Sequence, residues 1–441
     1  MMLKNNSRHY GELRQFLDNL PAIDTHEHYA GYLEADEDTL DFILANYMFQ
    51  DFLNGGGEHD FMLKPGTFQW IMKKEGLTPA ERYEIFLRTY KNVKNTAYSR
   101  GVMEGLRQCW GVDSVENYEG ILELEKKLKT RSPSTDARIM EKFKIKARIS
   151  NIGIVKEFDA FLWGEVEHLP TSYFSVQVND LHDFHCAPDL ARLQKYLNRP
   201  VACLDDYLEC IDLYFEKFVG FGAVCIKDTS AYDRSLAFNL PSKYDAEKAF
   251  NDIIFNPRDM FGDDRTRPME DWLFHHIIRK AAAYDLPVQL HTGHMAVTRN
   301  EITKTNAAHL IPTMELHKNV RFDLFHGNWP YMDEYLFIGK NYPNAYLNLC
   351  WAQHIDPIYC IELMKRAVMT VPQNKIFAFG GDVAYAEYAA GYLSIARDNV
   401  ACALSELVES EWLDMDEARQ IAKDWFFNNP NNFYKLGFEA V

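Results

Sequence analysis

The sequence contains no apolar run long enough to cross a bilayer, so we do not expect an integral membrane protein. It also lacks a basic excess. Its 64 acidic and 47 basic residues give a formal net charge of -17, which disfavours nucleic acid and anionic membrane surfaces as partners. The eight cysteines form no CxxC pair, and several lie in apolar runs, as is typical of buried free thiols in a reducing compartment. The polar segment from Met1 to Tyr10 has no apolar core of a secretory signal, so we expect a cytoplasmic protein.

Short apolar runs of strand length alternate with amphipathic stretches from about residue 142 onward, and one earlier run, Ala22–Ile23, precedes them. Such alternation predicts a parallel sheet, and eight strands over this length predict an α/β fold, a closed (β/α)8 TIM barrel. A doubly wound sheet is the alternative, but no glycine-rich phosphate turn follows the first strand. The seven later strands are expected at Lys144–Ile149, Tyr173–Val178, Ala223–Ile226, Val288–Leu290, Val320–Phe325, Ala345–Leu349 and Lys375–Phe379.

The segment between the first and second strands is far too long for an ordinary βα loop. It carries its own helical patterns, such as Pro79–Tyr90 and Val115–Lys129. We therefore expect residues 1–28 and 142–441 to form the barrel, and residues 29–141 to form a helical cap inserted after strand 1. An unrelated appended lobe is the alternative. The stretch from Tyr388 to Tyr434 is expected to form helices that pack on the barrel.

Side chains that can bind a metal follow four of the candidate strands. His26 and His28 end the first strand, where the two-residue period points both imidazoles to one side. His291, His326 and Asp382 follow the fifth, sixth and eighth strands. In a barrel these strand ends meet at one mouth, which predicts that the five side chains converge. Each alone has a structural interpretation, since Asp382 could cap a helix, but their joint placement favours a shared metal centre.

Three histidine nitrogens and one carboxylate are ligands that suit a divalent metal with an open position for water. We expect His26, His28, His291 and Asp382 to bind it, with zinc first and manganese, iron or magnesium as alternatives. The metal would lower the pKa of its bound water towards about 7. Asp382 is then the expected general base. His326 would hydrogen-bond the water or polarise a substrate carbonyl, or else bind a second ion.

These motifs resemble the amidohydrolase superfamily, and within it the amidohydrolase 2 branch. The resemblance lies in Asp24-Thr25-His26-Glu27-His28, in the segment Arg321–Gly327 and in Lys375–Asp382. Gln289–Gly293 and the long insertion after the first strand are similar to uronate isomerases. The resemblance implies a TIM-barrel metal enzyme that acts on a small molecule. Carried over by position, the family's metal ligands fall on His26, His28, His291 and Asp382, and its sixth-strand histidine falls on His326.

Substrate binding is predicted from three basic residues. Lys227 follows the fourth strand, and the stretch from Lys227 to Arg234 is similar to a Lys-x4-Tyr-x-Arg motif of mononuclear relatives, in which a cationic pair would face the substrate. Two alternatives stay open for Lys227: a carboxylated lysine that bridges two metals, or a structural residue. Arg299 could bind a substrate carboxylate through its forked guanidinium, or form a salt bridge at the rim.

Weaker candidates surround this set. Tyr98 and Trp351 could line the pocket, and His294 could orient a metal ligand. His182 and His185 have a spacing that suggests a metal site, but we interpret them as part of a solvated loop.

The leading functional hypothesis is a metal-dependent hydrolase of the amidohydrolase type, which attacks a carbonyl-type centre in a small polar, anionic substrate. A uronate-isomerase-like aldose/ketose isomerase and a metal-dependent decarboxylase of the same fold are the alternatives. The sequence Val383-Ala384-Tyr385 after Asp382 departs from the polar cluster of the isomerase pattern. A non-enzymatic binding module would not need a ligand set with an open position. A homo-oligomer is compatible with the sequence.

Overall fold

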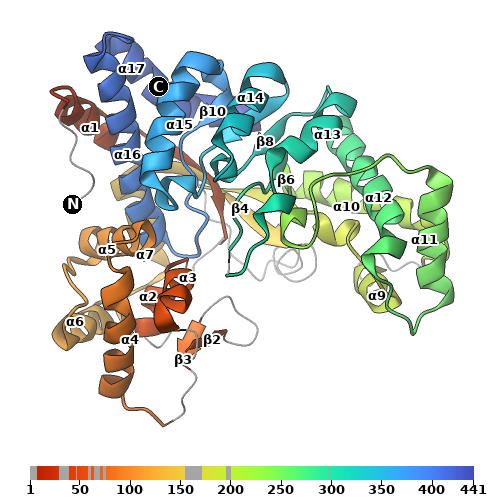
Figure 1. Cartoon of the computed structure of the whole chain (residues 1–441), viewed down its shortest axis with the longest axis horizontal. Coiled ribbons are helices and arrows are strands. Elements are labelled where there is room, and N and C mark those ends of the chain that lie inside the picture. The colour runs from red at the N-terminus through yellow and green to blue at the C-terminus, as the bar shows by residue number, and fades with distance from the viewer. Residues whose placement is uncertain are drawn as a thin grey trace.

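A parallel sheet of eight strands forms the centre of the molecule in the computed structural model (Figure 1). The structure describes residues 7–28, 39–45, 47–57, 61–63, 70–72, 76–153, 171–194, 200–296 and 298–441. The strands pair in chain order, each with its sequence neighbour. They are β1 (Ala22–Glu27), β4 (Ile145–Gly153), β5 (Ser172–Gln177), β6 (Ala223–Asp228), β7 (Val288–Leu290), β8 (Phe322–Leu324), β9 (Ala345–Asn348) and β10 (Ile376–Phe377).

Backbone hydrogen bonds between β1 and the segment after β10 bring the two edges of this sheet together. The amide of Thr25 donates to the carbonyl of Phe379 at 3.3 Å, and the amide of Asp382 donates to the carbonyl of His26 at 2.8 Å. A third bond runs from the amide of His28 to the carbonyl of Val383 at 2.9 Å. The predicted (β/α)8 TIM barrel and its eight strands are therefore confirmed.

Helices surround the barrel and carry the expected start and stop signals. For example, α10 ends at Gly222, whose φ of 92° is the left-handed conformation that stops a helix at little steric cost. The longest helix between β6 and β7 begins at Asp263 and continues through Pro268. The helices of this part are α1 (Tyr10–Asn19), α9 (Ala187–Gln194), α10 (Leu204–Phe221), α11 (Lys243–Phe255), α12 (Asp263–Ala283), α13 (Ile311–Leu316), α14 (Met332–Asn341), α15 (Pro357–Thr370), α16 (Ala386–Glu409), α17 (Met415–Lys423) and α18 (Asn429–Tyr434).

The segment between β1 and β4 contains the helices that its sequence predicts, described in part. Thr78 and Glu81 form a reciprocal capping box, and Pro79 takes the first helical position. A two-stranded antiparallel sheet, β2 (Phe61–Leu63) with β3 (Trp70–Met72), was not predicted. Figure 1 shows this segment at the opposite end of the molecule from α11. Its helices are α2 (Thr39–Leu44), α3 (Met48–Phe52), α4 (Pro79–Val93), α5 (Ala97–Trp110), α6 (Tyr118–Leu128) and α7 (Pro133–Phe143).

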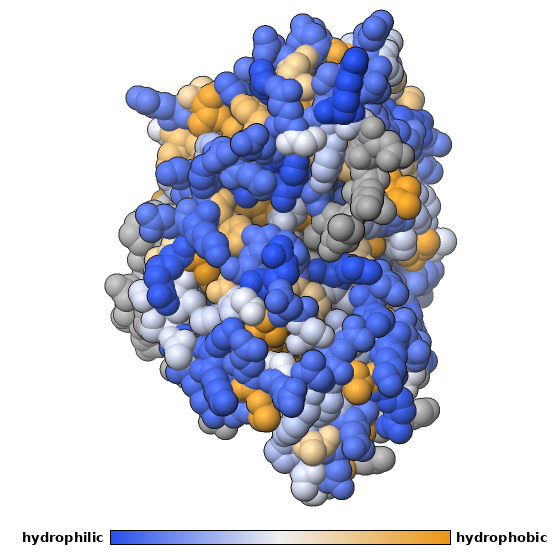
Figure 2. Space-filling view, turned by 90° about the vertical axis from the view of Figure 1, so that its left-hand side faces the viewer, coloured by the Kyte–Doolittle hydropathy of each residue, from blue (hydrophilic) through white to orange (hydrophobic). Residues whose placement is uncertain are grey.

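The C-terminal segment packs on the barrel, as predicted. Phe433 and Tyr434 belong to the same buried cluster as Ile23 and Phe377, which face the barrel interior. The hydroxyl of Tyr434 also accepts from the side-chain amide of Gln289, in β7, at 2.9 Å. Figure 2 shows one face of the molecule, on which hydrophilic side chains dominate and hydrophobic ones lie in small, scattered groups. None of the helices among the described residues combines the length and apolarity needed to cross a bilayer.

Candidate metal centre

Three of the predicted ligands meet at one end of the barrel. Nε2 of His28 lies 2.7 Å from Oδ1 of Asp382, and Nε2 of His26 lies 3.6 Å from the same oxygen. The three ligand atoms lie within 4.8 Å of one another. Asp382 is 5% exposed, whereas the side chain of His28 is 46% exposed, so the group is open to solvent on the His28 side.

His291 and His326 form a second layer beside this group. Nε2 of His326 lies 3.8 Å from Oδ2 of Asp382, and 3.0 Å from Nδ1 of His291. The Nδ1–H of His326 donates to the carbonyl of Cys350 at 3.0 Å. The structure thus brings His326 into contact with the carboxylate, and His291 reaches it through His326. His294 contributes its backbone carbonyl, 2.7 Å from Nε2 of His291, rather than its side chain.

The protonation states suit metal binding. Burial and the charge of Lys227 lower the pKa of His26 well below its ordinary value, and they lower the pKa of His291 to about 3. Burial would raise the pKa of Asp382, but the hydrogen bond from His28 and the neighbouring histidines hold it well below its ordinary value. Neutral imidazoles beside an ionised carboxylate are the forms that bind a divalent cation.

The spacing of the donors also fits an ion. Ligand atoms about 2.1 Å from a tetrahedral zinc stand about 3.4 Å apart, and the two measured separations to Asp382 lie on either side of that value. In the neutral state, His291 and His326 together have two N–H groups for three contacts, because carbonyls stand at both ends of the pair. One of the three contacts therefore lacks a proton. A nitrogen lone pair on His291 or His326 is then available to a cation. The residues present fit a divalent metal.

Lys227 lies deep in the same region. It is 1% exposed, and its Nζ stands 3.4 Å from the centre of the Phe325 ring. Within the described part of the chain, this Nζ has no hydrogen-bond partner. Burial lowers the pKa of Lys227 to about 8, and the carboxylate of Asp382 opposes that shift. A buried ammonium without an anion beside it can bind a negatively charged group of a substrate.

The two arginines predicted to bind substrate are placed differently. The guanidinium of Arg234 is buried and ion-paired with both Glu270, at 3.0 Å, and Asp271. Its charge is already balanced by two carboxylates, and its predicted role beside Lys227 in substrate binding stays a prediction. Arg299 is exposed and has a left-handed backbone, with φ of 66°. Among the described residues, Lys227 is a buried cation that the site offers a substrate.

Aromatic side chains from the segment between β1 and β4 and from the barrel form a wall near Asp382. Tyr47, the residue before α3, packs against Trp351 with ring centroids 4.1 Å apart and tilted planes, and its phenol interacts with the carboxylate of Asp382. Tyr98, in α5, is buried, and its ring centroid lies 5.8 Å from that of Tyr47. Its hydroxyl has no hydrogen-bond partner among the described residues. The sequence reasoning missed Tyr47. In the sequence, Tyr47 is marked only by its place in the insertion, and that place does not predict which part of the barrel its side chain contacts.

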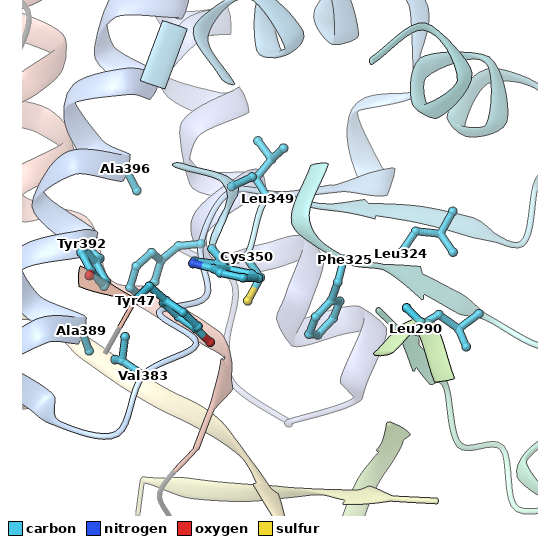
Figure 3. Close-up of a cluster of buried hydrophobic side chains, with 14 of the residues drawn as sticks. Tyr47, Leu290, Leu324, Phe325, Leu349, Cys350, Val383, Ala389, Tyr392 and Ala396 are labelled. Atoms are coloured by element: carbon cyan, nitrogen blue, oxygen red, sulfur yellow. The ribbon is translucent and has the colours of Figure 1, made fainter. Parts of the chain in front are cut away.

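The thiol of Cys350 was also missed. It is fully buried and lies within 4.8 Å of a ring nitrogen of His326 and a carboxylate oxygen of Asp382. Figure 3 shows Cys350 between Tyr47 on one side and Phe325 on the other. A Cβ built on Gly380 would stand 2.6 Å from the sulfur, so only glycine leaves room for this thiol.

His182 does not lie in a solvated loop, and that expectation was wrong. Its ring is fully buried, and Nε2 stands 2.6 Å from a carboxylate oxygen of Asp228, the last residue of β6. His185 is partly exposed and lies 3.2 Å from Asp183 and 3.8 Å from Glu270. Glu270 is already paired with Arg234, so this group is held together without an ion.

A comparison with protein families decides the assignment. The amidohydrolase family model matches residues 201–436, more than half of the chain. The chain belongs to the amidohydrolase family. Members of this family generally bind a divalent metal and act on small molecules.

One curated protein is similar to part of this amidohydrolase. Among curated proteins, it is 25% identical over 179 residues to the protein fluG of Emericella nidulans, a match that covers 38% of this chain and 20% of fluG. The chain thus spans about a fifth of the length of that relative.

Similar solved structures share the fold over nearly the whole chain. The uronate isomerase of Thermotoga maritima matches with a TM-score of 0.77 at 14% identity, covering 98% of this chain and 100% of its own. The glucuronate isomerase of Caulobacter crescentus gives 0.77 at 16% identity, with 99% and 96% covered. A Lactobacillus casei protein described as a metal-dependent hydrolase gives 0.63 at 15%, with 98% of both chains covered. At these identities the likeness establishes the fold alone.

Proposed function

We propose that this amidohydrolase is a metal-dependent hydrolase of a small anionic substrate with a carbonyl-type reacting centre. The observation that carries the proposal is the group of His26, His28 and Asp382, whose donor atoms gather around one point that is open to solvent beside His28. His291 is the proposed fourth ligand, and its Nδ1 lies 3.0 Å from Nε2 of His326, which itself faces Asp382. Zinc is the metal proposed first, because nitrogen ligands with one carboxylate are typical of it.

A divalent ion held by His26, His28 and Asp382 would supply Lewis-acid activation of water and of the substrate carbonyl. Asp382 takes the proton of the attacking water and returns it to the leaving group as the bond from the carbonyl carbon breaks. His326, whose Nε2 faces Asp382 at 3.8 Å, would accept a hydrogen bond from the attacking water and so orient it. Lys227 binds the anionic group of the substrate from inside the barrel.

We also propose that residues 29–141 are a cap on a barrel made of residues 1–28 and 142–441. The position of Tyr47 supports this division, because its phenol reaches Asp382 from the inserted segment. The stacking of Tyr98 near Trp351 supports it as well. Specificity would then depend on aromatic side chains of the cap.

An isomerase acting on a sugar acid is the second candidate. Its support is the likeness to two uronate isomerases over nearly the full chain, insertion included. The phenol of Tyr47 beside the carboxylate of Asp382 provides the two proton-transferring groups that such a reaction needs.

Metal analysis and product identification test the two functions. We expect about one divalent ion per chain in the purified protein, and loss of both the ion and the activity in His26→Ala. A panel of lactones, amides and hexuronates is then incubated in water enriched in oxygen-18. Label in the product supports the hydrolase. Turnover of a hexuronate without label establishes the isomerase, and a metal-free wild type that is unchanged by His26→Ala contradicts both.

A further inference from the structure

Asp24 and Glu27 are two buried acidic residues of β1 that the proposed chemistry does not use. Each is 1% exposed. They stand on either side of His26 in the chain, and neither is needed as a metal ligand. Burying two carboxyl groups inside a barrel costs free energy unless hydrogen bonds compensate for the lost water. The hydrogen bonds of Asp24 and Glu27 therefore indicate their role.

Both side chains bind the backbone of the loop that carries Asp382. Oδ1 of Asp24 accepts from the amide of Gly381 at 3.0 Å, and Oε2 of Glu27 accepts from the amide of Val383 at 2.7 Å. The amide between them, that of Asp382, donates to the carbonyl of His26 at 2.8 Å. Three consecutive amides of this loop are thus held by β1.

The loop needs this support because its own strand is short. β10 has two residues and ends at Phe377, five positions before Asp382. Asp382 itself has a left-handed backbone with φ of 56°, which is unfavourable for a residue other than glycine. The fit is also tight, since a Cβ on Gly381 would stand 2.3 Å from Oε1 of Glu27.

The two carboxyl groups affect each other's pKa. Burial raises the pKa of Asp24 to about 6, and burial with the charge of Asp24 raises the pKa of Glu27 well above its ordinary value. The charge of Arg148 lowers the pKa of both carboxyl groups and so opposes this effect. Oε2 of Glu27 accepts from the amide of Val383, and the amide oxygen of a glutamine at this position can reproduce that contact.

We propose that Asp24 and Glu27 are positioning residues, which fix the carboxylate of Asp382 by clamping the amides on both sides of it to β1. The effect on metal binding rests on the proposed function. The clamp itself does not, because it concerns the backbone of residues 381–383.

Hydrogen exchange and metal affinity test the clamp in the full-length protein. Glu27→Met keeps the volume of the side chain but removes the acceptor. We expect faster amide exchange in the segment around Gly381 to Val383, and about 10- to 100-fold weaker binding of Co²⁺. The visible spectrum of the Co²⁺ form should change as well. Glu27→Gln, which keeps an acceptor for the amide of Val383, should restore all three.

A matched control separates positioning from lost stability. Asp136→Ala removes another buried carboxylate, which pairs with Arg131 outside the barrel sheet. It should destabilise the protein and leave both the exchange of residues 381–383 and the Co²⁺ spectrum unchanged.

Two results would overturn the clamp. One is a Glu27→Met protein with wild-type exchange and Co²⁺ affinity. The other is rapid exchange of Gly381 and Val383 in the wild type, which decides the matter even if no variant folds. If the wild type binds no Co²⁺ but protects these amides, the proposed metal centre fails and the clamp stands.

Discussion

The amine of Lys227 is buried, and no anion is in direct contact with it among the described residues. The titration of this amine predicts how activity depends on pH. Its pKa of about 8 means that the amine is charged below pH 8 and neutral above it. If it binds the substrate anion, KM should rise as pH increases through 8, while the substrate stays ionised. The measurement is KM between pH 6 and 10 with the substrate found in the panel.

The variant Lys227→Met provides the comparison. It should have a raised KM at every pH and no further rise above pH 8. A wild type whose KM is constant up to pH 10 would assign Lys227 a structural role.

The site residues that could be predicted from the sequence are those whose place follows from their backbone position. His26, His291 and Asp382 stand at strand ends, and a barrel brings strand ends together whatever the details of packing. Tyr47 could not be found this way, because its place depends on the path of the inserted segment. Arg234 follows a strand closely as well, but its role depends on Glu270 and Asp271, which α12 supplies.

At the scale of elements, glycines let α5 of the insertion approach α16 of the barrel closely. A Cβ on Gly105 would stand 2.2 Å from the carbonyl oxygen of Glu387, and a Cβ on Gly391 would stand 2.1 Å from the carbonyl of Gly101. The ion pair between Arg131 and Glu387, at 2.7 Å, joins the same two parts. Since α5 also carries Tyr98, this contact fixes one wall of the site.

We expect Gly105→Ala to separate these helices. The added methyl group has no room against backbone atoms, so unfolding should become easier by about 1–3 kcal/mol. Displacement of Tyr98 should lower kcat/KM as well. Denaturant unfolding and steady-state kinetics measure the two effects. Gly220→Ala in α10 is the control, because no atom lies within 4 Å of its Cβ position, and it should be neutral or slightly stabilising.

Elements were predictable where local pattern and tertiary environment agree. The barrel strands are buried runs followed by amphipathic helices, so all eight were found. The pair β2 and β3 has three residues per strand, too short for a period-two pattern to register. α12 begins at Asp263, and its first turns are polar and include Pro268, so no apolar helical pattern marks its start.

At the scale of the whole molecule, the candidate metal centre joins the beginning of the barrel to its end. His26 lies in the first strand and Asp382 follows the last one, and the sheet closes through the hydrogen bonds between these two segments. An ion bound by both would stabilise the closed barrel, because it binds the folded chain and not the unfolded one.

Removing the metal should therefore lower the thermal stability of the protein. At a free metal concentration one hundred times the dissociation constant, the stabilisation amounts to about 2.7 kcal/mol. We expect the Tm to fall when a chelator removes the ion and to recover when zinc is added back, in a thermal unfolding scan. In Asp382→Ala, which lacks the carboxylate that both histidines approach, chelator and zinc should leave the Tm unchanged. Equal Tm values for metal-free and zinc-loaded wild type would show that no ion joins the two ends of the barrel, whatever the activity of the protein.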